Sequence, residues 1–310
     1  MAITRVETGN FFVFKSKFAA DFSLGVNVII GGNGTGKTTL IREMYNILKR
    51  GFHSGTPGTM SGSMVAKNEA TGEERLTFPL GSPMELTLDT ANVPYSIYIP
   101  EKDILEHAKG LLPFIKDKYT SFTQVYEDIL IAAQDVYTKA QSETQKSTGK
   151  KISDIIGGYV EWVPSEGMYY TVKTDGSRIP FTHEASGFKK LGLLGLLIAC
   201  GRLQPGSILF WDEPENSLNP ELVPILVDIL LELARSGVQI FIASHNEILA
   251  SYFDVNRKDE DKVMFVSLYK EKDIIKAKTS DRFDLLTPNK LTEEPVKLYE
   301  KKLDRGLGDE

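Results

Sequence analysis

Residues 31–38 of the chain read GGNGTGKT, between an apolar stretch, VNVII, and an amphipathic stretch, TLIREMYNILKR. The segment fits the pattern G-x-x-x-x-G-K-[ST], which requires a strand before the loop and a helix after it. Its glycines let successive backbone N–H groups face a phosphate, its lysine reaches the outer phosphate oxygens, and its last threonine offers a hydroxyl to Mg²⁺. A chance glycine-rich turn is the alternative. The motif predicts an α/β fold of the P-loop NTPase type.

The expected ligands of this loop are ATP and Mg²⁺. The residues expected to bind the nucleotide are Gly31, Asn33, Gly34, Thr35, Gly36, Lys37, Thr38 and Thr39. Thr38 is also expected to bind the Mg²⁺ ion that accompanies the phosphates.

Two later apolar runs end in polar residues that complement such a loop. SILFWDE (207–213) ends in Asp212, which can hold Mg²⁺ through water, and Glu213, which can orient or deprotonate the attacking water. IFIASHN (240–246) carries His245 at its end, where the γ-phosphate would be within reach. The alternatives are two ordinary acids after a strand and a structural histidine. We expect Glu213 and His245 to be catalytic and Asp212 to be a metal ligand.

The helix expected at 187–203 begins with ASGFKK, so that Lys189 and Lys190 fall in its first turn. A helix N-terminus already has partial positive charge, and acidic residues are usual there. Two lysines beside unpaired backbone N–H groups therefore indicate that an anion binds at Ser186 and Gly187. An ordinary N-cap on a core helix is the alternative. Gly192, inside the helix, costs about 1 kcal/mol and indicates close backbone packing, as does Gly195.

Composition limits the class of protein but does not identify it. Of 310 residues, 41% are hydrophobic and 25% charged, which is ordinary for a globular protein. The net charge of −6 gives no overall basic footprint for DNA, although a local stripe would not show in this number. The N-terminus has no signal-peptide pattern, and no apolar run reaches the length of a membrane span. The expected location is the cytoplasm, with no membrane partner.

The remaining pattern predicts one domain over 1–310 with three additions. Residues 51–85 form a Gly/Ser-rich excursion, and residues 101–150 form a short helical insert that ends in a polar linker, QSETQKSTGKK. Residues 159–181 form a small antiparallel sheet with a turn at Asp175–Gly176. The strands expected elsewhere are NFFVFKSKF, ADFSLGVNVII, SIYIP and a C-terminal hairpin, followed by a last helix.

Taken together, five motifs resemble ABC-type ATPases of the branch that SMC, RecF and OLD proteins share. They are GGNGTGKT, YIPEKD, ASGFKK, WDEPENSLNP and ASHNE, in the order of that family. The resemblance covers nearly the whole chain. It implies a mixed core sheet flanked by helices, with an antiparallel β subdomain and the helical insert within it.

The resemblance also implies an ATP-dependent homodimer, with higher assembly left open. In such ATPases two subunits pack head to tail, so Ser186 and Gly187 would cap the ATP held by the other copy's loop. Asn219 falls in the segment that crosses the interface, and it is expected to cap the next helix with Pro220 at the first position. Only ATP, with its γ-phosphate, would then hold the dimer.

Two departures from the family pattern bear on function. ASGFKK lacks the second glycine and the glutamine of transporter ATPases. No clear glutamine follows SIYIP, and Glu101 or Lys102 could take its place. Because that loop normally couples to a membrane domain, its change argues against a transporter subunit.

The insert and the C-terminal part restrict the biological role. About 50 residues of insert, without a heptad repeat, exclude the long arms of SMC proteins, and about 60 residues after His245 leave no room for a nuclease domain. A stand-alone head of this kind implies an ATP-driven switch on a separate effector protein, in anti-phage or toxin-like systems. The alternatives are a RecF-like DNA-repair ATPase, against which the acidic charge weighs, and an ATP-binding scaffold with negligible turnover, against which Glu213 weighs. An AAA+ hexamer is a more distant alternative.

Overall fold

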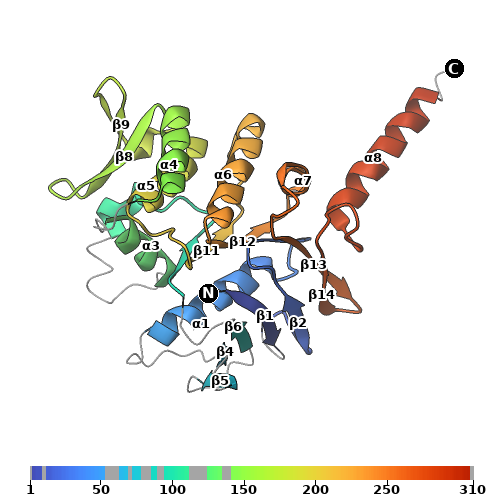
Figure 1. Ribbon diagram of the computed structural model, residues 1–310. Coiled ribbons are helices and arrows are strands. Elements are labelled where there is room, and N and C mark those ends of the chain that lie inside the picture. The colour runs from blue at the N-terminus through green and yellow to red at the C-terminus, as the bar shows by residue number, and fades with distance from the viewer. Residues whose placement is uncertain are drawn as a thin grey trace.

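The computed structural model describes residues 2–8, 12–52, 63–68, 72–77, 85–88, 94–111, 124–134 and 141–307. Its centre is a sheet with the strand order β14-β13-β3-β12-β11-β7 (Figure 1). These strands are β3 (Val26–Gly31), β7 (Ser96–Ile99), β11 (Ile208–Asp212), β12 (Gln239–Ser244), β13 (Val263–Glu271) and β14 (Ile274–Ser280). All neighbours pair in parallel except β13 and β14, which form an antiparallel hairpin. This mixed sheet confirms the predicted α/β class.

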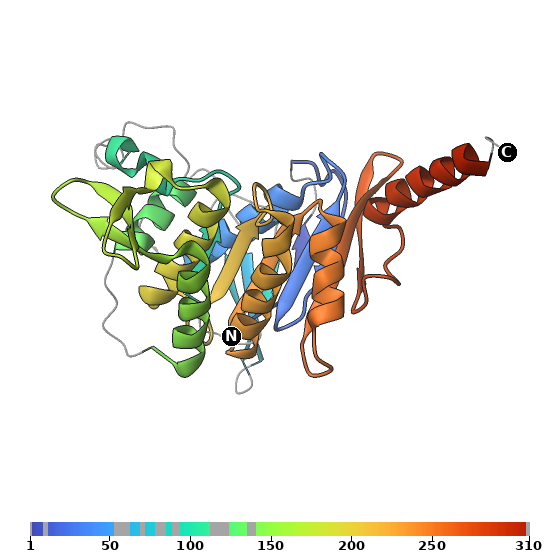
Figure 2. The same ribbon diagram turned by 90° about the horizontal axis from the view of Figure 1, so that it is seen from above.

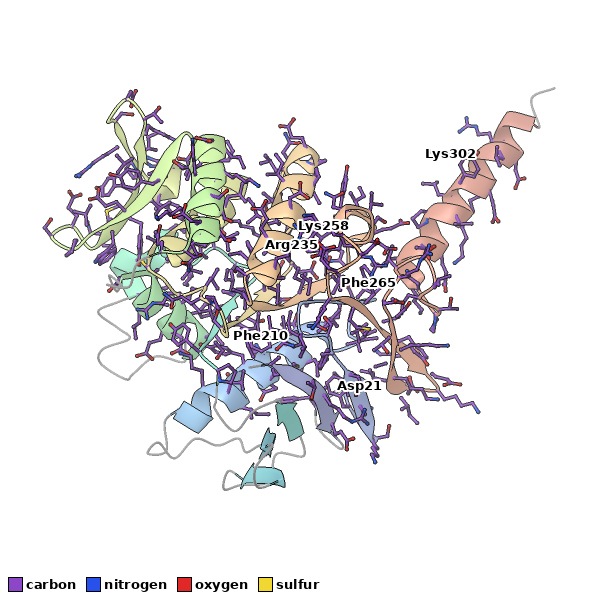
Figure 3. The ribbon with its side chains drawn as sticks, in the orientation of Figure 1. Asp21, Phe210, Arg235, Lys258, Phe265 and Lys302 are labelled. Carbon is purple, nitrogen blue, oxygen red and sulfur yellow. The ribbon has the colours of Figure 1, made fainter. Side chains whose placement is uncertain are left out.

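Both faces of the central sheet are buried, as the continuous apolar runs of its strands require. Successive side chains of a strand point to opposite faces, so each strand contributes to two cores. In β3, Val28 and Ile30 pack into one core and Ile29 into the other; in β11, Trp211 and Phe210 divide in the same way. Figure 3 shows Phe210 among the side chains that fill the middle of the molecule.

Helices cover one face of the sheet, and a helix with a second sheet covers the other (Figures 1 and 2). The first face carries α5 (Ser186–Ala199), α6 (Val223–Arg235) after the short η3 (Pro220–Leu222), and α7 (Glu247–Asn256). The other carries α1 (Lys37–Phe52) and a sheet of order β2-β1-β6-β4-β5. That sheet consists of β1 (Ile3–Thr8), β2 (Phe18–Asp21), β4 (Ser63–Asn68), β5 (Gly72–Thr77) and β6 (Glu85–Leu88).

A smaller unit of helices and a three-stranded sheet packs against α5. It contains η1 (Leu105–His107), α3 (Gln124–Gln134), α4 (Glu143–Ile156), β8 (Gly158–Val163), β9 (Met168–Lys173), β10 (Arg178–Pro180) and η2 (Phe181–His183). The predicted antiparallel sheet and its turn are confirmed, because Gly176 N–H donates to the Lys173 carbonyl across that turn. A Cβ on Gly192 would lie 2.7 Å from Val160 Cγ2, and one on Gly195 3.0 Å from Ile152 Cγ2. The two glycines therefore permit the close packing that the sequence indicated.

The prediction of a polar linker at 141–151 is wrong, because these residues begin α4. The Ser142 hydroxyl accepts a hydrogen bond from Gln145 N–H while the Gln145 side chain accepts from Ser142 N–H, a reciprocal capping box. The helix ends at Gly157, whose left-handed conformation (φ 67°) closes it. The face that α4 buries includes Gln145 and Thr148, and these polar residues hide its helical period in the sequence.

Other strand predictions hold in part. NFFVFKSKF is not a continuous strand: its described residues include a turn at 12–13 and a single bridge at Phe14, β2 begins only at Phe18, and β1 lies upstream. The 51–85 excursion contains β4 and β5, and its residues 53–62, 69–71 and 78–84 lie outside the described part of the chain. Residues 112–123 and 135–140 of the predicted helical insert also lie outside it.

The last helix, α8 (Lys290–Leu307), extends away from the rest of the molecule (Figures 1 and 2), and Lys302 lies on this projecting part (Figure 3).

Candidate functional site

The P-loop, residues 31–38, leads from the end of β3 into α1, as its motif requires. Gly34 and Gly36 have φ values of 72° and 90°, which suit glycine and few other residues. A Cβ on Gly36 would also lie 2.7 Å from Val13 Cγ2. Lys37 begins α1, and its buried Nζ donates to the Gly31 carbonyl at 2.9 Å. The loop therefore exposes backbone N–H groups at the N-terminus of a helix, an arrangement that binds phosphate.

The parallel pairing of β3, β12 and β11 brings the polar ends of these strands to one edge of the sheet. Thr38 Oγ1 donates to Asp212 Oδ1 at 3.0 Å, and the Tyr98 hydroxyl donates to Asp212 Oδ2 at 3.3 Å. Burial raises the pKa of Asp212, and the charge of Glu213 adds to this. A hydroxyl and a carboxylate in direct contact are oxygen ligands of the kind Mg²⁺ prefers, so Thr38 and Asp212 fit the expected metal.

A cavity of about 340 Å³ opens over the P-loop. It is lined by Val13, Asn33, Gly34, Gly36, Lys37, Thr38, Thr39, Glu101, Glu213 and His245. Gly31 and Thr35 lie in the body of the loop, where Thr35 Oγ1 donates to the Gly32 carbonyl at 2.8 Å. Segments far apart in the sequence thus meet around one volume.

The cavity distinguishes the two residues that could replace the missing glutamine. Glu101 lines it, and its Oε1 accepts from Asn216 Nδ2 at 2.9 Å. Lys102 instead lines a separate cavity beside η1. Glu101 is therefore the residue of the YIPEKD segment that lies at the nucleotide site.

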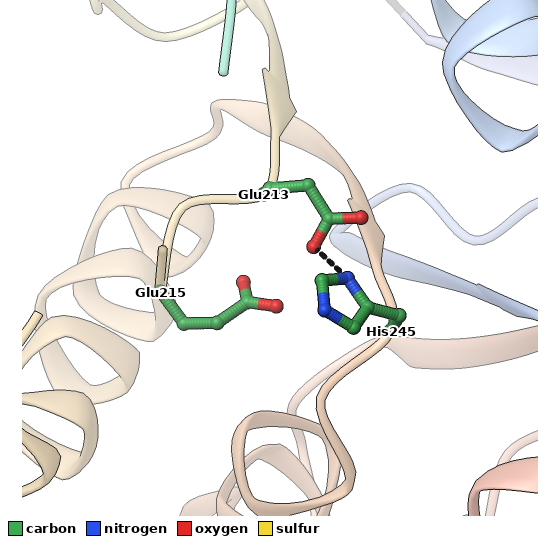
Figure 4. Close-up of side chains that lie close together, drawn as sticks. All are labelled: Glu213, Glu215 and His245. Carbon is green, nitrogen blue, oxygen red and sulfur yellow. Dashed lines mark ion pairs between the residues drawn. The ribbon is translucent and has the colours of Figure 1, made fainter. Parts of the chain in front are cut away.

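Glu213 combines a nearly buried side chain with an unusual backbone. Its φ is 47°, a left-handed conformation that costs a residue with a Cβ about 1–3 kcal/mol. Its N–H donates to the Ala243 carbonyl at 2.8 Å, which ties the turn to β12. Its Oε2 lies 2.5 Å from Nδ1 of His245, whose own side chain is 57% exposed (Figure 4). The carboxylate is held at the edge of the cavity while the imidazole faces solvent.

Two residues that the sequence analysis did not select complete this cluster: Glu215 and Ser244. Figure 4 shows the Glu215 carboxylate directed toward the His245 imidazole, and Ser244 Oγ donates to Glu215 Oε1 at 2.5 Å. Burial raises the pKa of Glu215 to about 7, and the Glu213 carboxylate adds to the rise. Glu215 could have been selected from the sequence, because it is a further acid of the WDEPE segment. Its orientation toward His245, however, depends on the fold.

Ligand atoms of Glu213, Glu215 and His245 lie within 4.8 Å of one another, a spacing that could also hold a cation. Glu213 and His245 also line the cavity above the P-loop.

The N-terminus of α5 lies apart from the cavity of the same chain. Ser186 is the first helical residue and is exposed, whereas Gly187 is buried, and a Cβ on it would lie 3.3 Å from the Ser217 carbonyl oxygen. Ala185, without a side-chain hydrogen bond, occupies the N-cap position. The alternative of a capping Ser186 is therefore wrong, and within the described part of the chain its hydroxyl makes no hydrogen bond.

The two lysines no longer support the anion predicted at Ser186 and Gly187, because their side chains bind elsewhere in the chain. Lys189 Nζ pairs with Glu106 Oε2 at 2.5 Å, and Lys190 Nζ donates to the Glu213 backbone carbonyl at 2.7 Å. Both side chains are buried in their own chain. Asn219 occupies the N-cap position of η3 with Pro220 at the first helical position, as expected, but its side chain donates to Glu221 Oε1 and makes no capping bond.

Comparison with known proteins gives one family and several related folds. A family described as "AAA domain, putative AbiEii toxin, Type IV TA system" matches residues 74–251. This range contains the ASGFKK, WDEPE and ASHNE segments but begins after the P-loop, which rests on its motif and geometry.

One curated relative is the energy-coupling factor transporter ATP-binding protein EcfA of Methanothermobacter thermautotrophicus. It is 36% identical over 73 residues, which are 23% of this chain and 22% of that protein. The chain thus matches about a fifth of that relative's length.

Two solved structures share the fold. An SMC head bound to the C-terminal winged-helix domain of ScpA gives a TM-score of 0.55 at 14% identity, covering 90% of this chain and 98% of the other. An Smc head with an extended coiled coil, bound to the C-terminal domain of ScpA from Pyrococcus furiosus, gives 0.51 at 12% identity, covering 96% and 98%. Identities this low show the fold alone, and that fold confirms the predicted ABC/SMC-like P-loop architecture. None of the helices described is both long and apolar enough to span a bilayer.

Proposed function

Because the chain belongs to the family described as "AAA domain, putative AbiEii toxin, Type IV TA system" and has an SMC-like head fold, we propose that it hydrolyses ATP between two copies of itself and thereby switches a separate effector protein. The family and the fold make it an ATP-binding domain of the AAA/ABC type. ATP turnover, the dimer and the effector protein are our proposals.

Hydrolysis is supported above all by the cavity that Glu213 and His245 share with the P-loop. With ATP on the loop, Glu213 accepts the proton of a water that attacks the γ-phosphate, and His245 contacts that phosphate. Lys37 leaves the Gly31 carbonyl to bind the phosphate oxygens. Mg²⁺, held by Thr38 and Asp212, would neutralise part of the phosphate charge.

A head-to-tail dimer is supported by the exposed Ser186 at the N-terminus of α5. This end of the helix does not line the cavity of its own chain, so a second copy is the natural source of a nucleotide for it. The Ser186 hydroxyl and neighbouring N–H groups would then bind the γ-phosphate that ADP lacks. Hydrolysis would release the dimer.

A separate effector is supported by the family and by the related structures. The family description names a toxin of a toxin–antitoxin system, and both solved SMC heads carry a bound partner domain. A toxin-like or anti-phage system is the setting we propose.

The test is steady-state hydrolysis with two variants and a control. Glu213→Gln is expected to lower kcat by about 10²–10⁴ while ATP still binds, since the substitution removes the base and little volume. Lys37→Ala is expected to abolish ATP binding, measured by calorimetry. Glu260→Gln, at an exposed acid distant from the P-loop in the sequence, is the control and should hydrolyse at the wild-type rate. A wild-type rate in Glu213→Gln would assign the base elsewhere, and undetectable turnover in the wild type would leave an ATP-binding scaffold.

The effector is identified by purifying Glu213→Gln from its native cell with Mg²⁺-ATP. A protein that co-elutes with this variant and is absent from a parallel Lys37→Ala purification would be the effector. The same proteins in both preparations would contradict an ATP-dependent switch.

A further inference from the structure

The side chain of Lys190 lies inside the molecule although it belongs to the first turn of a helix. It is 4% exposed, and its Nζ donates to the backbone carbonyl of Glu213 at 2.7 Å. A buried ammonium group is retained only where charges or strong acceptors stabilise it. An apolar side chain at this position could not donate a hydrogen bond to the Glu213 carbonyl.

The carbonyl that Lys190 contacts belongs to the strained residue of the site. Glu213 has a left-handed φ of 47°, and its carbonyl also accepts from Asn216 N–H at 3.1 Å. Together with the bond from Glu213 N–H to Ala243, these contacts fix both peptide groups of the residue. Lys190 is the side-chain donor among them, so it stabilises the conformation that aims the Glu213 carboxylate at the cavity.

The positive charge of Lys190 interacts with Glu213 and with three other acids near it. Burial lowers the pKa of Lys190, whereas the carboxylates of Asp103, Glu215, Glu101 and Glu213 raise it. These four acids would otherwise repel one another in a partly buried volume. The ammonium group of Lys190 offsets this repulsion.

We infer that Lys190 is a positioning residue for ATP hydrolysis: it holds the left-handed turn at Glu213 and so keeps the Glu213 carboxylate at the cavity. This inference rests on the proposed function, because it assigns Lys190 a role through the general base. Lys190 lies one helical turn from Ser186, so the same helix that faces the partner's nucleotide also holds the base of its own site.

Lys189 provides a matched control in the same turn of the same helix. It is 7% exposed, and its Nζ pairs with Glu106 and donates to the Thr182 carbonyl at 3.1 Å. Its described bonds do not reach Glu213. Lys189→Met therefore removes a buried ammonium group without loosening the turn at the base.

The experiment measures kcat, the ATP dissociation constant and thermal stability for Lys190→Met, Lys190→Arg and Lys189→Met. Lys190→Met, which keeps the length of the side chain, is expected to lower kcat at least tenfold with ATP affinity within threefold of wild type. Lys190→Arg keeps a charged donor and is expected to recover part of kcat. Lys189→Met is expected to keep kcat within threefold even where its stability falls. A wild-type kcat in Lys190→Met, or an equal loss in Lys189→Met, would overturn the inference.

A double variant separates positioning from general damage. If Lys190 acts through Glu213, adding Lys190→Met to Glu213→Gln should change the residual rate by less than twofold. If the fold-losses in kcat of the two single variants multiply in the double variant, Lys190 acts independently of the base, and the inference is overturned. If Lys190→Met does not fold, Lys190→Arg takes its place. Its effect on kcat is then compared in the chain with Glu213 and in the Glu213→Gln variant, and the same two outcomes decide. An unchanged rate in Glu213→Gln alone would refute the proposed function instead, so the two failures are distinguishable.

Discussion

At the residue scale, the site depends on carboxylates kept close together in a buried environment. Glu213 and Glu215 are separated by one proline, and both are nearly buried. Proximity of two acids favours a state in which one keeps its proton, as pairs of catalytic carboxylates show in general. Glu215, whose pKa is raised to about 7, therefore keeps its proton at acidic pH, and Ser244 donates to its Oε1.

The raised pKa of Glu215 predicts how stability changes with pH. Between pH 4.5, the ordinary pKa of a glutamic acid, and about 7, the unfolded chain releases this proton while the folded chain retains it. The free energy of unfolding therefore falls as pH rises through this window. Glu215→Gln cannot titrate but still accepts from Ser244, so its stability relative to wild type should increase by up to about 3 kcal/mol between pH 4.5 and 7.

Urea denaturation at pH 5 and pH 7.5, in EDTA to exclude bound cations, measures this difference. The exposed Glu260→Gln serves as the control and should track the wild type at both values. A Glu215→Gln advantage that is the same at both pH values would mean that Glu215 is already ionised in the folded chain.

At the element scale, strands and the P-loop could be predicted because their chemistry is local. Short apolar runs such as Ile208–Trp211 are typical of buried strands, and polar residues at the ends of parallel strands meet at one edge of the sheet. The sequence therefore indicated that Asp212, Glu213 and His245 lie near Lys37. Their roles in catalysis stay predictions.

Other elements could not be predicted because tertiary contacts decide them. Gln145 lies on the buried face of α4 although it is polar. Its side chain donates to the Leu203 carbonyl, 58 residues away in the sequence. In the sequence, Lys190 lies in the first turn of a helix and indicates a nearby anion. In the structure, the backbone carbonyl of Glu213, from another segment, accepts its hydrogen bond. No periodicity or spacing identifies such an acceptor.

The packing of α4 and β8 on α5 predicts opposite effects for two glycine substitutions. Gly192→Ala places a Cβ 2.7 Å from the stiff Val160 side chain and should destabilise the fold by about 1–3 kcal/mol. Gly149→Ala, inside α4 with no atom within 4 Å of the new Cβ, should stabilise it by about 0.5–1 kcal/mol. Thermal and chemical denaturation of both variants checks this. Equal effects of the two substitutions would show that α5 does not approach β8 closely.

At the scale of the whole molecule, one chain presents two unlike surfaces that the proposed dimer would bring together. The first is the cavity over the P-loop, closed on one side by Glu213 and His245. The second is the exposed start of α5, whose backbone packs on the Ser217 and Leu218 segment next to the acidic residues. The described residues that line the first cavity do not include Ser186 or Gly187. Two copies arranged head to tail would place each surface opposite the other, and the γ-phosphate would join them.

Ser186→Arg tests this arrangement directly. An arginine at the exposed start of α5 should exclude the partner's nucleotide by its bulk, so ATP should no longer produce dimers, although the monomer should bind ATP with unchanged affinity. Light scattering of the slowly hydrolysing Glu213→Gln background, with and without Mg²⁺-ATP, measures the mass. Ser165→Arg, at an exposed turn between β8 and β9, adds the same side chain elsewhere and should leave the dimer intact. Nucleotide-dependent dimers of Ser186→Arg would mean that the two copies meet through another surface, whereas loss of dimers in both variants would point to the added charge and not to the position.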